Sequence, residues 1–282
     1  MPGISDEQLA GADVMGALTQ LAENLAGARP PAKPAEPTGP AALRVPDFAS
    51  IAECVPPTGA GHFSLLDPSC SNEYSEQFRL LRTQLMLHRA RFERDQDFRT
   101  VCVMSTQKGE GKSFTASNLA AVLAVAGGQK VLLLDSDTGS APLPIGVPLS
   151  EGAGLPYALS NPEDWPRTAY RVQGTPLYVL PRAARNRART LDLEPLPRLL
   201  GVLRQQFDWI IVDGAAFASC PDAGWLTAAA DGTLLVVRQN AAGFGAVQES
   251  LMSVPPERLV GVVFNQSKSQ PKVRVRLRMK IG

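Results

Sequence analysis

The chain has 282 residues, of which 44% are hydrophobic and 20% charged, a composition typical of one sizeable globular core with an additional segment. The net charge of +1 excludes a global electrostatic attraction to nucleic acid, and we expect no nucleic-acid partner. The start, MPGISDEQLAGADVMG, lacks a basic n-region and an apolar h-region, and no stretch approaches ~18 uninterrupted apolar residues. We therefore expect no signal peptide and no transmembrane segment of its own.

The chain contains four cysteines and two histidines, and neither type forms a recognisable site. The cysteines form no CxxC pair and lie away from any histidine at metal-ligand spacing. His62 and His88 are isolated, and we expect neither to act as a catalytic base. Reduced thiols, and hence a cytoplasmic location, follow as the expectation.

Two regions are expected along the chain. Residues 1–61 are predicted to be a flexible N-terminal region: 5–27 have apolar side chains at roughly helical spacing, and the Pro/Ala-rich linker ARPPAKPAEPTGP follows. Residues 43–70 carry turn signals and are expected to be irregular. We predict that residues 62–282 form the folded domain.

Predicted strands and helices alternate through this domain. The helices are expected at 72–94, 113–128, 193–207 and 223–230. The strands are expected at 100–105, 130–137, 176–181, 208–214, 232–238 and 258–266. Several strands are apolar throughout, which indicates a parallel sheet covered on both faces. The predicted fold class is α/β, with a doubly wound, mainly parallel sheet flanked by helices as a three-layer sandwich.

A glycine-containing loop, STQKGEGKS, follows the strand at 100–105 and opens the helix at 113–128. Such a loop turns main-chain N–H groups toward phosphate oxygens, and the helix dipole favours the anion. The lysine adds a point charge and the serine a hydroxyl for Mg²⁺. The predicted nucleotide-binding residues are Gln107, Lys108, Gly109, Glu110, Gly111, Lys112, Ser113 and Phe114. The alternative is a glycine-rich turn before an ordinary helix, since Thr106 stands where the full P-loop pattern has its first glycine.

Carboxylates follow two of the buried strands. Asp135 and Asp137 end VLLLDSD, and Asp213 ends WIIVD. Ligands of open α/β sheets bind at this edge, where a carboxylate can hold magnesium or orient an attacking group. We predict Lys112, Asp135 and Asp137 as catalytic residues and Ser113, Asp135 and Asp213 as metal ligands. The alternative is a set of solvated strand-end aspartates.

With these motifs, residues 72–266 resemble the bacterial tyrosine kinases of capsule and exopolysaccharide export, the BY-kinases. That family belongs to the deviant P-loop ATPases, with the chromosome-partitioning and division-site proteins. The resemblance is carried by EYSEQFRLLRTQL, STQKGEGKSFTASNLA, KVLLLDSD, LYVLP, FDWIIVDG, PDAGWLTAAADGTLLVVR and LVGVVFNQ. It implies ATP and Mg²⁺ as cofactors and a P-loop ATPase/kinase-like domain. It also places Asn265 near the adenine base, unless Asn265 is a plain strand-end residue.

The helix at 72–94 carries Glu76, Arg79 and Arg82 at spacings of three, which resembles the family's oligomerisation motif. This resemblance implies assembly into a homo-oligomeric ring. The alternative is a set of intrahelical ion pairs that stabilise the helix by only tenths of a kcal/mol.

Three departures from the family pattern stand out. Gly139 lies near the position of the family's usual arginine, and DGAA replaces the usual Pro-Pro pair after Asp213. No tyrosine follows the last core strand, where the family carries its autophosphorylation cluster.

The end, PKVRVRLRMKIG, alternates with period two and predicts an edge strand whose basic face blunts the edge or contacts anionic lipid or an acidic partner. Four arginines at 182, 185, 187 and 189 are expected to form a solvated face; the alternative is that they reach a phosphate or carboxylate of a partner.

The resemblance therefore implies an ATP-dependent phosphotransferase, a protein-tyrosine kinase-like enzyme, or an ATPase in exopolysaccharide synthesis. It implies a membrane-embedded polysaccharide-export partner as activator and a cytoplasmic location, including the inner face of the membrane. Two alternatives stay open: an ATP-dependent positioning switch like the partitioning and division-site ATPases, and a nucleotide-binding regulatory subunit without turnover. Lys108 stands one step late for the switch group's signature lysine, whose position is taken by Gln107.

Overall fold

The computed structural model describes residues 46–57, 62–66, 75–92, 98–147, 153–183, 191–221, 223–238, 241–265 and 274–277. The helix expected at 5–27, the linker after it, and Arg185, Arg187 and Arg189 lie outside these residues. In the described part of the chain, no helix combines the length and the apolar character needed to cross a membrane.

Nine strands form one sheet in the order β1-β4-β5-β3-β6-β2-β7-β8-β9. Neighbouring strands run parallel except for the antiparallel pairs β4–β5 and β8–β9. The strands are β1 (Ala52–Cys54), β2 (Thr100–Ser105), β3 (Val131–Asp135), β4 (Tyr170–Val172), β5 (Leu177–Leu180), β6 (Trp209–Ala216), β7 (Gly232–Arg238), β8 (Leu259–Asn265) and β9 (Arg274–Leu277).

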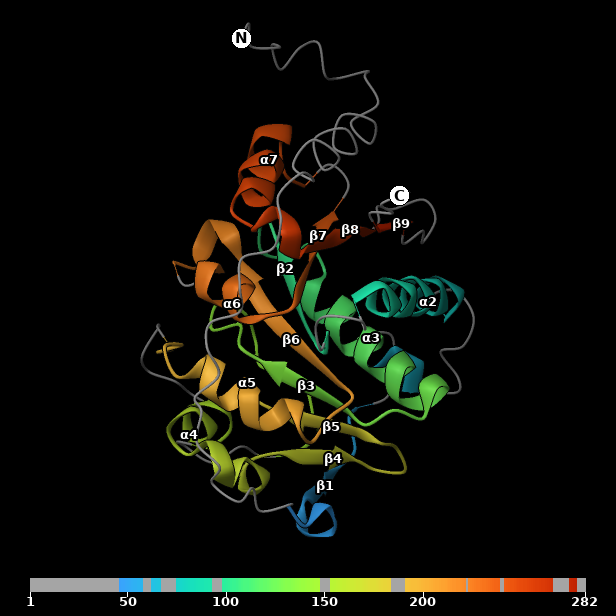
Figure 1. The fold of residues 1–282 in the computed structure, drawn as a ribbon, viewed down its shortest axis with the longest axis vertical. Coiled ribbons are helices and arrows are strands. Elements are labelled where there is room, and N and C mark those ends of the chain that lie inside the picture. The colour runs from blue at the N-terminus through green and yellow to red at the C-terminus, as the bar shows by residue number, and fades with distance from the viewer. Residues whose placement is uncertain are drawn as a thin grey trace, which may run out of the picture.

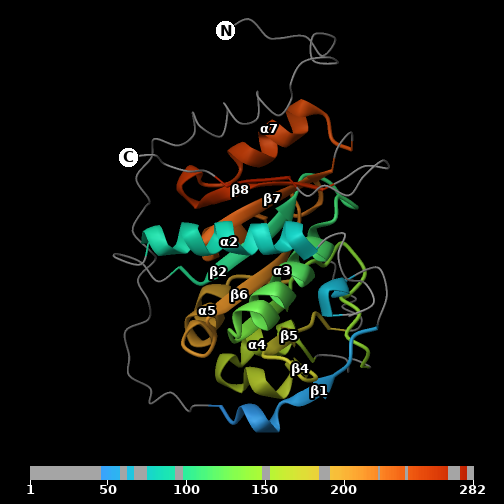
Figure 2. The same cartoon turned by 90° about the vertical axis from the view of Figure 1, so that its right-hand side faces the viewer.

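Helices cover both faces of this sheet (Figures 1 and 2). The α-helices are α2 (Ser75–Phe92), α3 (Lys112–Gly127), α4 (Leu155–Ser160), α5 (Leu196–Arg204), α6 (Ala223–Ala229) and α7 (Phe244–Met252). Short 3₁₀ helices are η3 (Phe48–Ser50), η4 (Ser64–Leu66), η6 (Pro162–Arg167), η7 (Phe217–Ser219) and η8 (Pro256–Arg258). Helices α2 and α3 lie on one face, and α4 to α7 pack on the other.

The alternation of side chains along the strands divides the core into two layers. In β2, Val101 and Val103 pack with α2 and α3, whereas Cys102 and Met104 pack with the opposite helices. All four are fully buried, because a central parallel strand is covered on both faces. The predicted fold class, a doubly wound and mainly parallel α/β sandwich, is confirmed.

The predicted elements match well in the centre of the sheet and less well at its edges. Strands β2 and β7 have the predicted bounds, and the predicted basic edge strand appears as β9, antiparallel to β8. Helix α7 and strand β4, which lies between β1 and β5, were not predicted. Both are short, at 9 and 3 residues, so neither provides a long periodic pattern.

The predicted start of the folded domain at residue 62 is wrong. Strand β1 pairs in parallel with β4, and Ile51 is 4% exposed. The ring of Phe48 packs against Tyr178 and Phe207, with centroid distances of 5.4 and 5.9 Å. The segment from Phe48 onward therefore belongs to the folded unit, because its aromatic and aliphatic side chains complete the core beside β4 and β5.

Candidate functional site

The glycine loop lies between the end of β2 and the start of α3. Gly109 and Gly111 have φ values of +81° and +94°, which L-residues rarely adopt. A Cβ on Gly111 would clash with Nδ2 of Asn265, so a side chain here would have to displace the Asn265 amide. The loop therefore requires glycine for both conformation and close approach.

Hydrogen bonds inside the protein hold this loop in shape. The Glu110 carboxylate is fully buried and accepts from the N–H groups of Gln107, at 2.7 Å, and Arg238, at 3.4 Å. Asn265 donates from Nδ2 to the carbonyl of Glu110 at 2.9 Å, so the end of β8 supports the loop directly. Burial raises the pKa of Glu110, and the main-chain N–H groups offset part of this shift. Of the predicted nucleotide-binding residues, Glu110 thus directs its carboxylate into the protein.

The side chains of two other predicted loop residues extend toward elements outside the loop. The ring of Phe114 packs edge-on against Phe78 of α2, with 5.9 Å between centroids. The exposed side chain of Lys108 reaches toward Gly139, where an added Cβ would lie 3.4 Å from its Nζ. The absence of a side chain at position 139 therefore leaves space for this lysine.

Asp135 and Asp213 lie side by side on adjacent strands. They are register partners of β3 and β6, and each is 1% exposed. Burial raises the pKa of Asp135 to about 6, although it accepts hydrogen bonds from the N–H groups of Leu143 and Asp137. Burial and the nearby Asp135 raise the pKa of Asp213 well above its usual value, and its Oδ1 has no hydrogen-bond partner in the described structure. These two carboxyls would gain most from a cation placed between them.

Lys112 connects the loop to the third carboxylate. Its Nζ forms an ion pair with Asp137 and lies 3.2 Å from the hydroxyl of Ser140, and both charged side chains are about 5% exposed. Burial alone would raise the pKa of Asp137, but the hydrogen bonds from Lys112 and Ser140 outweigh it and lower the pKa. Thus Lys112, Asp135, Asp137 and Asp213 are gathered at one edge of the sheet, and the alternative of solvated strand-end aspartates is wrong.

The donor set suits a magnesium ion that arrives with a phosphate group. Among the residues that the structure describes, no three His, Cys, Asp or Glu side chains form a complete metal site. Ser113 lies beside Asp213, where its side chain lowers the pKa of that carboxyl. Mg²⁺ commonly takes one or two carboxylates and completes its shell with phosphate oxygens and water. Ser113, Asp135 and Asp213 could supply the protein part of such a shell.

The sequence missed one charged residue of this site. Arg182, which follows β5, is 8% exposed and donates to the carbonyls of Asp137 and of Ser140, the latter at 2.7 Å. The expected solvated face is therefore wrong for Arg182. No sequence pattern indicates this contact. Its two partners lie 42 and 45 residues earlier in the chain and become neighbours of Arg182 only because β5 and β3 are adjacent in the sheet.

The predicted oligomerisation residues belong to α2, the helix that packs on α3 (Figure 2). Glu76 and Arg79 are exposed and form an ion pair at 3.0 Å. Arg82 is half-buried, and its guanidinium lies near Gly127 at the end of α3. Two of the three charges thus face solvent, whereas the third packs within the chain.

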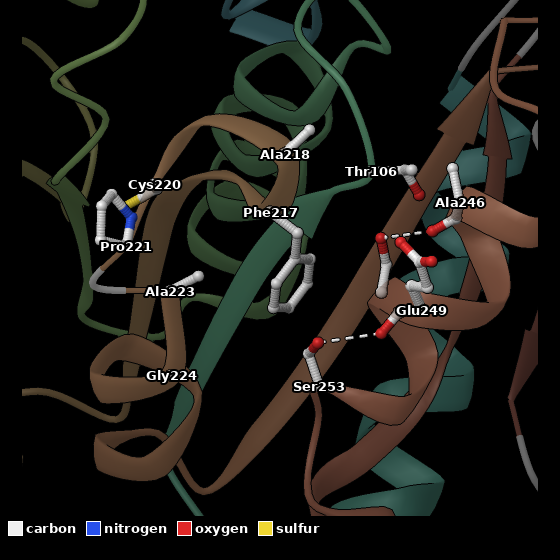
Figure 3. A pocket seen from close by; sticks show the side chains of 11 residues that line it. Thr106, Phe217, Ala218, Cys220, Pro221, Ala223, Gly224, Ala246, Glu249 and Ser253 are labelled. Atoms are coloured by element: carbon white, nitrogen blue, oxygen red, sulfur yellow. Dashed lines mark hydrogen bonds between the residues drawn. The ribbon is translucent and has the colours of Figure 1, made fainter.

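A separate cavity of about 380 Å³ lies next to the loop (Figure 3). Its walls come from η7, α6 and α7, and the loop contributes only Thr106. The Thr106 hydroxyl is buried without a hydrogen-bond partner in the described structure. The main-chain carbonyl of Thr106 accepts a hydrogen bond from the N–H of Ala218. The cavity contains none of the predicted site residues.

A glycine loop before a helix, with a buried lysine and strand-end carboxylates, defines a P-loop nucleotide-binding domain. The family comparison agrees: residues 101–279 match the CobQ/CobB/MinD/ParA nucleotide binding domain. The chain therefore belongs to this family.

Several relatives carry the names that the resemblance implied. The succinoglycan biosynthesis transport protein ExoP of Rhizobium meliloti is 32% identical over 176 residues, which cover 60% of this chain and 22% of ExoP. The tyrosine-protein kinase YwqD of Bacillus subtilis is 27% identical over 209 residues, covering 73% of this chain and 85% of YwqD. The resemblance to the kinases of exopolysaccharide and capsule synthesis is thus confirmed, although the chain spans only about a fifth of ExoP.

Solved structures show the same fold. The chimerical protein CapA2B2 superposes with a TM-score of 0.62 at 20% identity, over 79% of this chain and 96% of that one. The kinase domain of the Escherichia coli tyrosine kinase ETK gives a TM-score of 0.59 at 21% identity, over 72% and 80% of the two chains.

Proposed function

We propose that this chain binds ATP with Mg²⁺ and transfers the γ-phosphoryl group in the synthesis or export of an exopolysaccharide. The observation that carries the proposal is that Lys112 and three aspartates lie close together beside the glycine loop: Lys112 pairs with Asp137, and Asp135 and Asp213 are neighbours on adjacent strands. The named relatives support the phosphotransferase assignment, since YwqD is a tyrosine-protein kinase and ExoP a succinoglycan transport protein.

In this proposal the loop and Lys112 hold the phosphates. Main-chain N–H groups from Gln107 to Ser113 surround the β-phosphate, and Lys112 leaves Asp137 to contact the β- and γ-phosphates. Ser113, Asp135 and Asp213 would hold the metal, which would supply positive charge next to the phosphate oxygens. Asp137, freed from Lys112, is then the carboxylate that orients or deprotonates the acceptor hydroxyl.

Asn265 and the other loop residues complete the proposed nucleotide site. Asn265 already fixes the carbonyl of Glu110, and its amide stands where β8 ends beside the loop. We place the adenine base next to it. Lys108, which is exposed and reaches across toward Gly139, closes over the phosphates.

The acceptor is proposed to lie outside this chain. The four tyrosines of the sequence all precede β8. We therefore propose a partner protein or water as the acceptor of the phosphoryl group. We propose a cytoplasmic protein that meets a membrane-embedded export partner, which activates it, and a homo-oligomer that contacts its neighbour through Glu76 and Arg79 on the exposed face of α2.

The test is incubation of the purified protein with γ-labelled ATP and Mg²⁺, with and without the cytosolic segment of the export partner. We expect labelled phosphate release or a labelled protein, followed by mass spectrometry of the phosphosites. Lys112→Ala is the control and should remove both signals. Absence of both signals from the unmodified protein under every condition would refute the phosphotransferase and ATPase assignments together.

A further inference from the structure

The charged residues that the fold buries are concentrated at one place. Among the described residues, six charged side chains belong to buried residues: Glu110, Lys112, Asp135, Asp137, Arg182 and Asp213. Because burying an unpaired charge is costly, each must be compensated locally. Glu110 is satisfied by main-chain N–H groups, which leaves three aspartates opposite the two cations Lys112 and Arg182.

The two cations contact different parts of the same turn. Lys112 reaches side chains, namely the carboxylate of Asp137 and the hydroxyl of Ser140. Arg182 reaches the main chain, through separate guanidinium nitrogens that donate to the carbonyls of these same two residues. A planar guanidinium can bridge two carbonyls in this way, whereas a lysine ammonium is a single point charge.

This division of contacts matters when the nucleotide binds. Lys112 must leave the turn in order to reach phosphate, and it then no longer holds Asp137 and Ser140. The turn also orients Asp135, whose carboxyl accepts from the N–H groups of Asp137 and of Leu143, at 3.2 and 3.1 Å. Without Arg182 the segment that follows β3 would lose its remaining charged support at that step.

We propose that Arg182 is a positioning residue that keeps the Asp137–Ser140 turn in place, so that Asp135 and Asp137 stay oriented after Lys112 moves to the phosphates. This inference rests on the proposed function of the same site. Arg182 acts on the carboxylates through the main chain, and its guanidinium is committed to two carbonyls rather than to the nucleotide.

The proposal predicts a division between phosphate binding and metal-dependent steps. The loop from Gln107 to Ser113 should still bind ADP in EDTA when Arg182 is replaced. The gain in ADP affinity on adding Mg²⁺, and the turnover number with Mg·ATP, should fall because the carboxylates lose their orientation. A small misplacement of such groups costs about tenfold or more.

The experiment compares the unmodified protein with Arg182→Met and Arg182→Lys by calorimetric titration with ADP, in EDTA and in Mg²⁺. Arg182→Met should bind ADP in EDTA within about twofold of the unmodified protein, while its Mg²⁺-dependent gain falls about tenfold. Arg182→Lys should lie between the two, because one ammonium restores part of the charge but not both hydrogen bonds. Turnover should follow the same order, with the loss in kcat rather than in KM.

A matched control separates this effect from a loss of stability. Arg204→Met removes another poorly exposed arginine that donates to a carbonyl, at the opposite edge of the sheet. Arg204→Met should keep the Mg²⁺-dependent gain even if its melting temperature falls.

The outcomes distinguish the two proposals. If the unmodified protein binds no ADP, the proposed function fails. If it binds and Arg182→Met either matches it in both buffers or loses affinity equally in both, the positioning role of Arg182 is wrong. Arg182→Lys provides the same test if Arg182→Met does not fold.

Discussion

Two ion pairs with little solvent exposure lie at opposite ends of the parallel strands, and they differ in how completely their polar atoms are satisfied. At the N-terminal edge, Arg204 and Asp231 pair at 3.0 Å, and Asp231 also accepts from the N–H groups of Arg99 and Thr100. Arg204 further donates to the Thr100 hydroxyl and to the carbonyl of Ala229. The groups of this network find their partners within the protein, and they join α5 to the start of β2 and to the segment between α6 and β7.

At the C-terminal edge, the network around Lys112 and Asp137 does not close. Asp213 has an unpartnered Oδ1 in the described structure, and it lies beside a second carboxyl whose pKa is also raised. A closed network, whose polar atoms all have partners within the protein, only holds structural elements together. A network with unpartnered polar atoms can accept a ligand, and we call it open. The difference identifies which of the two pairs belongs to a functional site.

The largest effect on stability is expected at the closed network. Arg204→Met leaves the poorly exposed Asp231 without its cation, which should lower the free energy of unfolding by about 3 kcal/mol. Nucleotide affinity should not change, because the loop lies at the other edge. Chemical denaturation and a nucleotide titration of the same preparation check both statements. If Arg204→Met changed nucleotide affinity without a loss of stability, the distinction between a structural network around Arg204 and a functional one around Lys112 would be wrong.

The open network should make stability depend on pH in the absence of metal and nucleotide. The pKa of Asp135 is about 6 in the folded protein, above its value of 3.8 in an unfolded chain. The folded state therefore binds more protons between about pH 4 and 6, and stability falls as pH rises through this window. The loss of stability is on the order of 3 kcal/mol, and Asp135→Asn should not show it. Denaturation curves at a series of pH values test this; an equal slope in the variant would contradict it.

Asp213→Asn should increase stability while it removes function. The variant loses a buried carboxyl that repels Asp135, so the free energy of unfolding at pH 7 should rise by about 1–2 kcal/mol. Turnover should fall because a predicted metal ligand is gone. Thermal melts check the change in stability, and steady-state turnover with Mg·ATP checks the loss of function. A destabilised variant would show that Asp213 is structural, like Asp231.

The smallest effect is expected at the exposed pair on α2. Glu76→Ala should change the stability of the monomer by only a few tenths of a kcal/mol, because solvent screens this pair. If the pair contributes to assembly, sedimentation will show a smaller oligomer for Glu76→Ala and Arg79→Ala alike. An unchanged oligomer in both variants would make the pair an intrahelical contact only.

The sequence could predict the open network better than the closed one. The glycine loop and strand-end aspartates follow a local pattern, because neighbouring parallel strands bring their carboxyl ends to one edge. The central strands were recognisable from continuous apolar runs. Arg182 and Arg204 carry no such pattern, since their partners depend on which strands and helices become neighbours.

The edge of the sheet escaped prediction for a related reason. Strand β1 has three residues and pairs with β4, which lies more than 110 residues later in the chain. Neither strand is long enough for alternation to show. The inward direction of Glu110 was also hidden, because its acceptor role depends on the N–H of Arg238 at the end of β7.

The central claim is that Lys112 and the glycine loop bind the phosphates of Mg·ATP. Calorimetric titration of the unmodified protein and of Lys112→Met with Mg·ATP tests it most directly. We expect saturable binding to the unmodified protein and affinity weakened about 100-fold or more in the variant, which corresponds to about 2.7 kcal/mol. Equal affinities, or no saturable heat with the unmodified protein, would contradict the account.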